Sequence, residues 1–398
     1  MHLYDFYHRH RARRLSVSDF WTYELSMWLH TLAHSLTSIF IPILMLKSGF
    51  TIPAVIGYYV LYNVLDVPLN FLARAIVARF GARFVIAIAT IAVIIFFSIL
   101  LTISSPSIGV LILLAIFGAL YDALYWVAHI FLFIGSYGAA KRTGKSTGIL
   151  YAIRQCALML GPVIGAALLV FFDERALLLA VVAFFILSLY PLGKVDEFPD
   201  VPASRPLAAK YFFAAREGKR TFLSVVLYAV HDTAESVIFP VFIYITFGTL
   251  QSVALVPIVM SLAAMVIALI LGNVHPNKRG FAIAAGASAI ALIWLVRLYL
   301  GSPTIYYGSI FVIGILAYFV LVPLDSLIFE YGRAVHDPLS ASMYRNIAFM
   351  GSNVVFYGIL AIFVSIFTPG FALAAAALLG LFIFTLAQFL LPNDRGVR

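Results

Sequence analysis

The chain has 398 residues, of which 63% are hydrophobic and 11% are charged, and its mean hydropathy is +1.04. Soluble domains carry about 25% charged residues, so this composition excludes an ordinary soluble protein. The net charge of +9 is spread over many short segments and forms no single patch, which argues against a nucleic-acid partner. The single cysteine, Cys156, excludes a disulfide framework.

Twelve stretches of the chain are long and apolar enough to cross a bilayer, which takes about 20 mostly apolar residues. They are too long, and too rarely alternating, to be the strands of an outer-membrane barrel. The sequence therefore predicts an all-α membrane protein with twelve transmembrane helices. In chain order these stretches cover residues 19–46, 53–78, 84–103, 108–137, 147–172, 176–193, 221–247, 250–272, 281–300, 304–331, 341–367 and 370–391.

The first and seventh stretches repeat one another. Residues 25–44 align without a gap on residues 223–242, an offset of about half the chain. A repeat of this length in apolar segments predicts two pseudo-symmetric six-helix bundles joined head to tail. The identical pairs are Leu25/Leu223, Ser26/Ser224, Leu29/Leu227, Ser38/Ser236 and Pro42/Pro240.

The only long hydrophilic segment, residues 194–220, contains prolines and mixed charges and is typical of a linker. We therefore expect an N-terminal bundle at 1–193, a cytoplasmic linker at 194–220 and a C-terminal bundle at 221–398. No segment is large enough for a soluble catalytic domain, and no GxxxxGK[ST] phosphate loop is present. These features favour a protein that is not an enzyme, needs no cofactor and is driven by an ion gradient.

Lysines and arginines gather before the first span, between spans 2 and 3, between spans 4 and 5, in the linker and after span 8. Because basic residues stay on the cytoplasmic side, both termini and the linker are predicted to be cytoplasmic. The sequence has no Asn-x-Ser/Thr acceptor, which favours a prokaryotic inner membrane. We expect the protein to be a monomer.

The loop after the second span resembles a family signature. Residues 74–83, RAIVARFGAR, approach the pattern G-x-L-A-D-R-x-G-R-R, which the major facilitator superfamily carries between its second and third helices. Arg79, Gly81 and Arg83 match the pattern, whereas Arg74 replaces the leading glycine and Ala78 replaces the acid. In the family that acid helps to lock the two halves on the inner side, so this chain must latch differently or less firmly.

The fifth span carries Gly161-Pro162-Val163-Ile164-Gly165, which is similar to the GPxxG element associated with antiporters of the same family. The resemblance to the major facilitator superfamily covers essentially the whole chain at the level of topology. It implies two six-helix bundles that rock about a central site and transport a small solute. The GPxxG element favours export in exchange for protons.

Polar side chains recur in the middle of the predicted spans, where a charge costs at least about 2.5–3.5 kcal/mol. Such residues need a partner or an aqueous cavity, so the sequence predicts a polar central cavity. Aromatic rings at the same depth suit an amphipathic substrate. The expected lining residues are His30, His34, Asn63, Asp122, Tyr125, Trp126, Tyr228 and His231.

Three carboxylates, Asp66, Asp232 and Glu235, have no basic residue near them in the sequence or at the same depth. A carboxylate in a low dielectric without a cation takes up a proton readily, as a proton carrier must. We therefore expect proton coupling through one of these three residues.

Two arginines, Arg154 and Arg345, lie in the inner halves of spans 5 and 11. We interpret both as structural counter-charges or gating residues, with direct contact to substrate as the alternative. The expected partners are Asp122 or His129 for the first and Asp325 or Glu330 for the second.

A divalent metal site was the other interpretation of the polar residues. His231 and Glu235, four residues apart, resemble a helical two-ligand site, and His30 and His34 would complete it. No Met-rich tract or His-rich loop supports metal handling, so a proton relay or hydrogen-bonding surface is favoured and no metal site is expected.

The sequence thus predicts a secondary active transporter that moves a small amphipathic organic solute by alternating access, as proton-coupled export. Its partners would be this solute, protons and the lipid bilayer. Proton-linked uptake of a small metabolite, divalent metal transport and a non-transporting scaffold or lipid scramblase stay open as alternatives.

Overall fold

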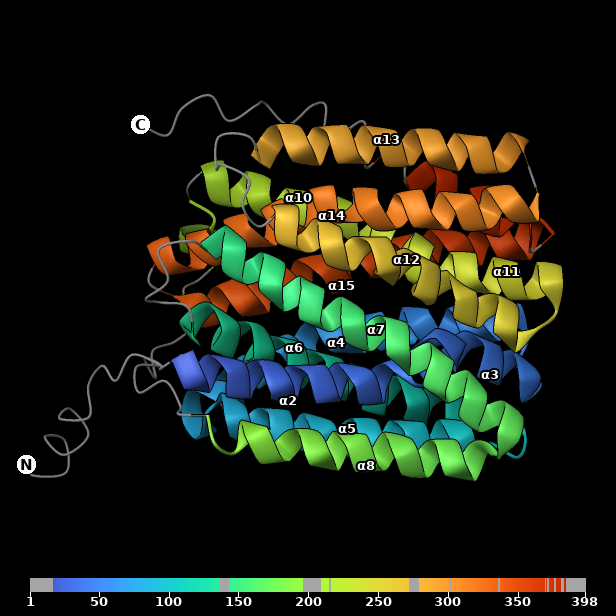
Figure 1. Ribbon diagram of the computed structural model, residues 1–398, viewed down its shortest axis with the longest axis horizontal. Helices are drawn as coiled ribbons and strands as arrows, with labels where there is room; N and C mark the ends of the chain where they lie inside the picture. The colour runs from blue at the N-terminus through green and yellow to red at the C-terminus, as the bar shows by residue number, and fades with distance from the viewer. Residues whose placement is uncertain are drawn as a thin grey trace, which may run out of the picture.

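The computed structural model describes residues 17–136, 143–195, 209–214, 216–271, 279–300, 302–335, 337–368 and parts of 370–383. Within these residues all regular secondary structure is helical, and Figure 1 shows the long helices running side by side along the longest axis. The elements are α2 (Val17–Ser35), η1 (Ser38–Phe40), α3 (Ile41–Lys47), α4 (Ile52–Phe80), α5 (Ala82–Leu101), α6 (Ile108–Ser136), α7 (Thr143–Phe171), α8 (Glu174–Leu192), α9 (Ala209–Phe212), α10 (Arg216–Thr233), η2 (Ala234–Ile238), α11 (Phe239–Phe247), α12 (Leu250–Leu271), α13 (Arg279–Tyr299), α14 (Pro303–Ala334) and α15 (Pro338–Ile366).

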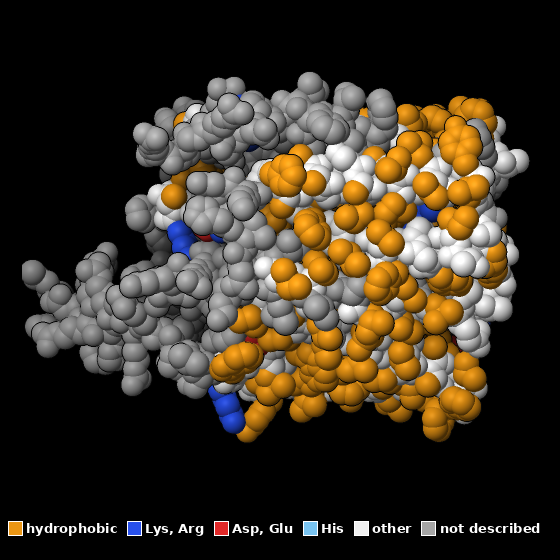
Figure 2. Space-filling model, turned by 45° about the horizontal axis from the view of Figure 1, so that its top comes forward, with side chains coloured by type: hydrophobic (Ala, Val, Ile, Leu, Met, Phe, Trp, Pro, Cys, Tyr) orange, Lys and Arg blue, Asp and Glu red, His pale blue; other side chains and the backbone are white. Residues whose placement is uncertain are grey.

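Most of these helices are long and apolar enough to cross a membrane. Ten helical segments of the described chain meet both criteria, from Trp21–Lys47 to Pro338–Ile366. An eleventh predicted span corresponds to α12, which contains the shorter apolar stretch Leu250–Leu262. The predicted twelfth span, 370–391, lies largely outside the described residues. Hydrophobic side chains cover much of the visible surface in Figure 2, as expected where a protein faces lipid. The predicted all-α membrane class is confirmed.

The helices pack in a similar pattern in the first and second parts of the chain, which we call the N-terminal half (α2–α8) and the C-terminal half (α10–α15). In the N-terminal half α4 and α5 pack against α6, and α2 packs against α7 and α8. In the C-terminal half α12 and α13 pack against α14, and α10 packs against α15. The halves meet along two long helix pairs, α7 with α12 and α4 with α15.

The helix pair α4 and α15 is joined by aromatic packing at one end. We call the end at which α4 stops and α15 begins the inner end, and the opposite end the outer end. Towards the outer end, the rings of Tyr59 and Tyr357 stack nearly parallel, with centroids 4.9 Å apart and planes 7° apart. A hydrophobic cluster with members from both halves surrounds this stack, so the contact excludes water.

The first and seventh predicted spans are interrupted at the same position of the sequence repeat. The first consists of α2, η1 and α3, and the seventh of α10, η2 and α11. Pro42 and Pro240 explain both interruptions, because proline has no N–H and its ring clashes with the carbonyl four residues earlier. The first span passes the break as a tight 3-10 turn, in which Phe40 N donates to Thr37 O (2.9 Å). The seventh passes it as a wider π-helical turn, Ala234–Ile238.

Candidate functional site

A narrow cavity lies between the two halves, and its outline takes in about 400 Å³ of space that is partly open to solvent. Its walls come from α2, α6 and α7 on one side and from α14 and α15 on the other. Apolar side chains such as Met27, Phe133 and Phe329 alternate with aromatic and charged ones, which suits an amphipathic ligand. The polar and aromatic lining residues are Thr31, Tyr125, Trp126, His129, Tyr151, Arg154, Asp325 and Arg345.

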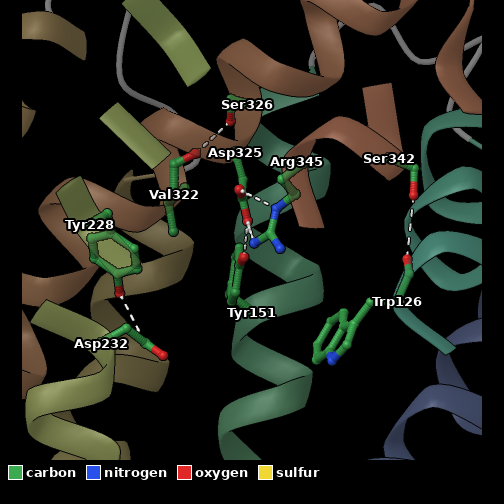
Figure 3. A network of polar contacts seen from close by, with 9 residues as sticks. All are labelled: Trp126, Tyr151, Tyr228, Asp232, Val322, Asp325, Ser326, Ser342 and Arg345. Carbon is green, nitrogen blue, oxygen red and sulfur yellow. Dashed lines mark hydrogen bonds and ion pairs between the residues drawn. The ribbon is translucent and has the colours of Figure 1, made fainter. Parts of the chain in front are cut away.

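Three of these residues converge from three different helices (Figure 3). Arg345 of α15 pairs with Asp325 of α14, with an N–O distance of 3.1 Å and two hydrogen bonds to the two carboxylate oxygens. Tyr151 of α7 donates a hydrogen bond to the same carboxylate. The ion pair between Arg345 and Asp325 expected from the sequence is therefore present. Because its two charges neutralise one another, this pair adds little net charge to the cavity.

Arg154, in contrast, forms no ion pair within the described part of the chain. Its guanidinium lies over the ring of Trp126, 5.0 Å from the centroid. Neither of its expected partners, Asp122 and His129, meets Arg154 in an ion pair or hydrogen bond among the described residues. Asp232 is a carboxylate whose field reaches Arg154, but it lies beyond ion-pair distance. The cavity therefore carries one positive charge that no neighbouring carboxylate contacts directly.

The histidines of the first span lie behind the cavity wall. The ring of His30 stacks on that of Tyr125, with centroids 4.0 Å apart and planes 6° apart, and its Nε2 is 3.0 Å from the hydroxyl of Tyr121. The ring of His34 stacks against Tyr121 as well. Neither histidine lines the cavity, so that expectation is wrong. The α-helical period places them on the correct face of α2, but the rings of α6 cover them; His129 of α6 is the histidine that reaches the cavity.

The expected lining residues of the seventh span also lie outside the cavity. The hydroxyl of Tyr228 is 3.5 Å from Asp232 Oδ1, and the ring of His231 meets that of Tyr228 edge to face. Figure 3 shows Tyr228 and Asp232 on a different helix from the residues that surround Arg345.

Glu235, the third carboxylate expected to lack a cation, is paired. Arg297 of α13 donates to Glu235 Oε1 at 2.7 Å, and both side chains are buried. The guanidinium also lies 3.8 Å from the ring centroid of Phe239 and 4.8 Å from that of Trp294. The expectation of an unpaired Glu235 is wrong, because the long side chain of Arg297 reaches it from α13, 62 residues further along the chain.

Asp66 and Asp122 lie together between α4 and α6, away from the cavity. The carboxyl groups are within hydrogen-bonding reach of each other, and both are buried. Asn346 of α15 points its amide nitrogen at both of them. Asn63, expected in the cavity, is buried and donates to Tyr59 O of its own helix at 2.6 Å.

The signature after the second span connects the two halves through Arg74, one of the two residues that depart from the family pattern. Arg74 Nε donates to Ser340 Oγ at 3.1 Å, and its guanidinium lies 3.8 Å from Asp337 Oδ2, both near the start of α15. The inner contact thus uses an arginine of α4 and an acid of α15.

The matching residues of the signature have local roles. Gly81 has φ of 88°, a backbone conformation that residues with a side chain rarely adopt, and it permits the tight turn from α4 to α5. Arg83 donates to Gly193 O at the end of α8 (3.2 Å). Arg79 is exposed and lies over the ring of Phe80.

The glycines of the GPxxG element at 161–165 let α7 approach the end of α2. A Cβ added at Gly161 would overlap Ser35 Oγ, and one added at Gly165 would overlap the carbonyl oxygen of Leu36. These contacts explain why small residues are needed here. The association of the element with antiport stays a prediction.

The residues of the metal hypothesis are not gathered into one site: His30 stacks on Tyr125, whereas Glu235 pairs with Arg297. Among the described residues no group of three or more His, Cys, Asp or Glu could hold a metal ion. Sequence reasoning also missed Tyr151, which lies one helical turn before Arg154 and could have been found by that spacing.

Comparisons with known proteins agree with this architecture. The family model of the Major Facilitator Superfamily matches residues 24–336. The chain belongs to the major facilitator superfamily. It is similar to the solved structure of the human organic anion transporter MFSD10 (TETRAN), with a TM-score of 0.70 and 14% identity, over 94% of this chain and 99% of that chain. It is also similar to that of the nucleoside transporter NupG, with a TM-score of 0.65 and 11% identity, over 94% of this chain and 98% of that chain. No curated protein matches the chain.

As a member of the major facilitator superfamily, the protein is a multi-pass membrane transporter and not an enzyme. At these low identities the solved structures show a common fold alone. The family likewise supports secondary transport of a small molecule, in agreement with the sequence analysis.

Proposed function

We propose that the protein transports a small amphipathic organic anion through the cavity between its halves, by export in exchange for protons. The observation that carries the proposal is Arg154, a cation that lines the cavity, lies over Trp126 and contacts no carboxylate of the described chain. The neighbouring Arg345 is already neutralised by Asp325, which leaves Arg154 as the group for a ligand anion.

The energetics support an anionic ligand. A charge at membrane depth costs at least about 2.5–3.5 kcal/mol unless a partner or water compensates it. An anionic substrate would supply that partner, and a guanidinium binds carboxylate or phosphate groups with two parallel hydrogen bonds. The rings of Tyr125, Trp126 and Tyr151 would take the apolar part of the same molecule. MFSD10, to which the fold is similar, is an organic anion transporter, and this agrees with the substrate class.

Proton exchange is supported by the carboxylates at mid-span and by the GPxxG resemblance. Of the three carriers expected from the sequence, Glu235 is neutralised by Arg297, so the candidates are Asp66 and Asp232, which form no ion pair within the described part of the chain. Uptake would replace export if the proton gradient drove the anion inward. Radiolabelled substrate flux into vesicles of opposite orientation, with the same imposed pH gradient, distinguishes the two directions.

The test of the anion site uses purified protein and a panel of aromatic carboxylates and sulfonates, with the corresponding uncharged amides as matched ligands. We expect the anions, but not the amides, to raise the thermal unfolding temperature. Arg154→Gln should weaken anion affinity at least about tenfold, which corresponds to about 1.4 kcal/mol.

Arg175→Gln, at an exposed arginine in the first turn of α8, is the control and should bind like the wild type. Equal binding of acids and amides, or unchanged affinity in Arg154→Gln, would contradict the proposal.

We also propose that the protein is a monomer of the inner membrane with both termini in the cytoplasm. The distribution of basic residues supports this orientation. In a Cys156→Ala background, a cysteine at Ser105 or Ser302 should react with an impermeant reagent from outside. Labelling only from the cytoplasmic side would reverse the orientation.

A further inference from the structure

Two buried carboxyl groups meet at mid-span between α4 and α6. Asp66 and Asp122 each lie 14 residues from both ends of their helices. Both side chains are buried, and their carboxyl groups lie within hydrogen-bonding reach of each other. Asp66 Oδ2 nevertheless meets no hydrogen-bond donor in the described part of the chain. Because two ionised carboxylates are both acceptors, such a contact requires a proton between them.

The remaining contacts of this pair are to neutral groups, namely the hydroxyl of Tyr62, which hydrogen-bonds Asp122, and two amides. Asn70 Nδ2 donates to Asp66 Oδ1 at 2.6 Å. Asn346 Nδ2 lies 2.9 Å from Asn70 Oδ1, 3.3 Å from Asp122 Oδ2 and 3.4 Å from Asp66 Oδ1. Asn346 belongs to α15, so it reaches the pair from the opposite half of the molecule. The pair thus sits at the seam between the halves.

Among the described residues, no cation contacts the pair directly. The other titratable or charged groups whose fields reach it are Tyr58 and Tyr62 of α4, Tyr121 of α6 and Arg345 of α15. The tyrosines are neutral, and the guanidinium of Arg345 is held by Asp325 at 3.1 Å. A proton is therefore the simplest way to remove one of the two negative charges.

We propose that Asp66 and Asp122 share one proton, and that this proton fastens α4 and α6 to Asn346 of α15. The inference rests on the proton exchange of the proposed function and assigns its proton-binding site. With the proton present, the pair carries one negative charge that the amides of Asn70 and Asn346 can satisfy. When the proton leaves to water, two like charges remain in a low dielectric and repel one another.

The same helix connects the proton to the anion cavity. Arg345 and Asn346 are consecutive residues of α15, and the first lines the cavity while the second contacts the carboxyl pair. A shift of α15 on proton loss moves both residues together. The inner contact of Arg74 with Asp337 and Ser340 also joins α4 to α15, so it loosens in the same movement.

The test measures the separation of the inner ends of the two halves as a function of pH, without substrate. In a Cys156→Ala background, spin labels are placed at Phe80→Cys on α4 and Phe281→Cys on α13, both of which are exposed. The protein is reconstituted into liposomes in sodium-free buffer, and the distance distribution is recorded by pulsed electron resonance. We expect a short distance at acidic pH and a longer one at alkaline pH, with a single transition.

Asp66→Asn and Asp122→Asn each replace a carboxyl group by an amide of the same shape that resembles its protonated form. We expect both variants to keep the short distance at every pH. Glu24→Gln, at a buried carboxyl of α2, which packs against α7 and α8, is the matched control and should keep the wild-type transition.

A wild-type distance that does not change with pH, or a wild-type transition in Asp66→Asn, would overturn the inference. A return to the short distance on adding sodium at alkaline pH would also overturn it, in favour of a metal cation. Because no substrate is present, the result is independent of the anion proposal. Gradient-driven transport with a pH-insensitive distance would leave the proposed function intact and reject this proton site alone.

Discussion

The first and seventh spans repeat one another in sequence, and both are interrupted at the same position. The contacts made at this break differ between the two spans. In the first, Ser35 and Leu36 lie against Gly161 and Gly165 of α7, so backbone meets backbone. In the seventh, the π-helical turn carries Glu235, which pairs with Arg297 of α13. The proline fixes where the helix opens, because its ring excludes a regular turn. The residues near this break can therefore differ between the two spans. In the first span the backbone packs closely against α7, whereas in the seventh span an ion pair is buried.

The hydroxyl groups at the equivalent positions Ser35 and Thr233 show what the copies still share. Ser35 Oγ donates to Ala157 O of α7 at 3.0 Å. Thr233 Oγ1 contacts Asn353 Oδ1 of α15 at 2.8 Å. Each copy therefore connects its broken span to a neighbouring helix through the hydroxyl group of the last residue of the helix before the break. The two copies thus share an interhelical hydrogen bond, and they differ in the side chains that occupy the space at the break.

The largest expected effect comes from removing the ion pair of the seventh span. Glu235→Gln leaves Arg297 buried without an anion, which should lower the free energy of unfolding by about 3–5 kcal/mol. The double variant Glu235→Leu/Arg297→Met should regain most of that loss, because no buried charge remains. Thermal unfolding in detergent measures both.

The control is Thr37→Val, at the equivalent position of the first span, where the buried hydroxyl has no hydrogen-bond partner in the described chain. It should be nearly neutral. Equal losses in Glu235→Gln and Thr37→Val would show that the two copies do not differ energetically.

A smaller effect is expected from filling the close contact of the first span. Gly165→Ala places a methyl group on the carbonyl of Leu36, so α7 must move away from α2. Overpacking of this kind costs about 1–3 kcal/mol. Gly358→Ala on α15, where a Cβ meets no atom within 4 Å, is the matched control and should be neutral. A neutral Gly165→Ala would mean that close packing is not what the GPxxG element provides here.

The smallest effect is expected from removing the interhelical hydrogen bond that both spans share. Ser35→Ala and Thr233→Val each remove one interhelical hydrogen bond, which is worth about 0.6 kcal/mol on average in a membrane protein. The two variants should lower the unfolding temperature by similar small amounts. A lower unfolding temperature in only one of the two variants would show that only one span depends on this hydrogen bond.

The fold class was predictable because composition and span length depend on the sequence alone. Twelve apolar stretches indicated the spans, and the identical pairs indicated the repeat, whereas the helix break at Pro42 and Pro240 was seen only in the structure. Helical spacing also placed His30 and Tyr125 at matching depths. It could not show that the ring of one covers the other, because that depends on how α2 and α6 are rotated about their axes.

The site was less predictable because its contacts join residues far apart in the chain. Arg297 pairs with a residue 62 positions away, and Arg74 bonds to one 266 positions away. The departure of Arg74 from the family signature was visible in the sequence, but its acidic partner was not. Tertiary packing decides which of several compatible charges meet.

The pair of helices α4 and α15 is fastened by two kinds of chemistry, aromatic stacking of Tyr59 on Tyr357 towards the outer end and ionic contact of Arg74 with Asp337 at the inner end. Dissolved ions screen ionic contacts and leave ring stacking unchanged, but they screen a largely buried pair much less than an exposed one. The side chains of Arg74 and Asp337 are 5% and 17% exposed, so only salt near 1 M, where the Debye length is about 3 Å, weakens their contact. Ionic strength on the inner side therefore acts on one closure only. Concentrated salt there weakens the inner contact and leaves the outer one unchanged, so high ionic strength in the compartment that the inner end faces favours separation of α4 from α15 at the inner end first.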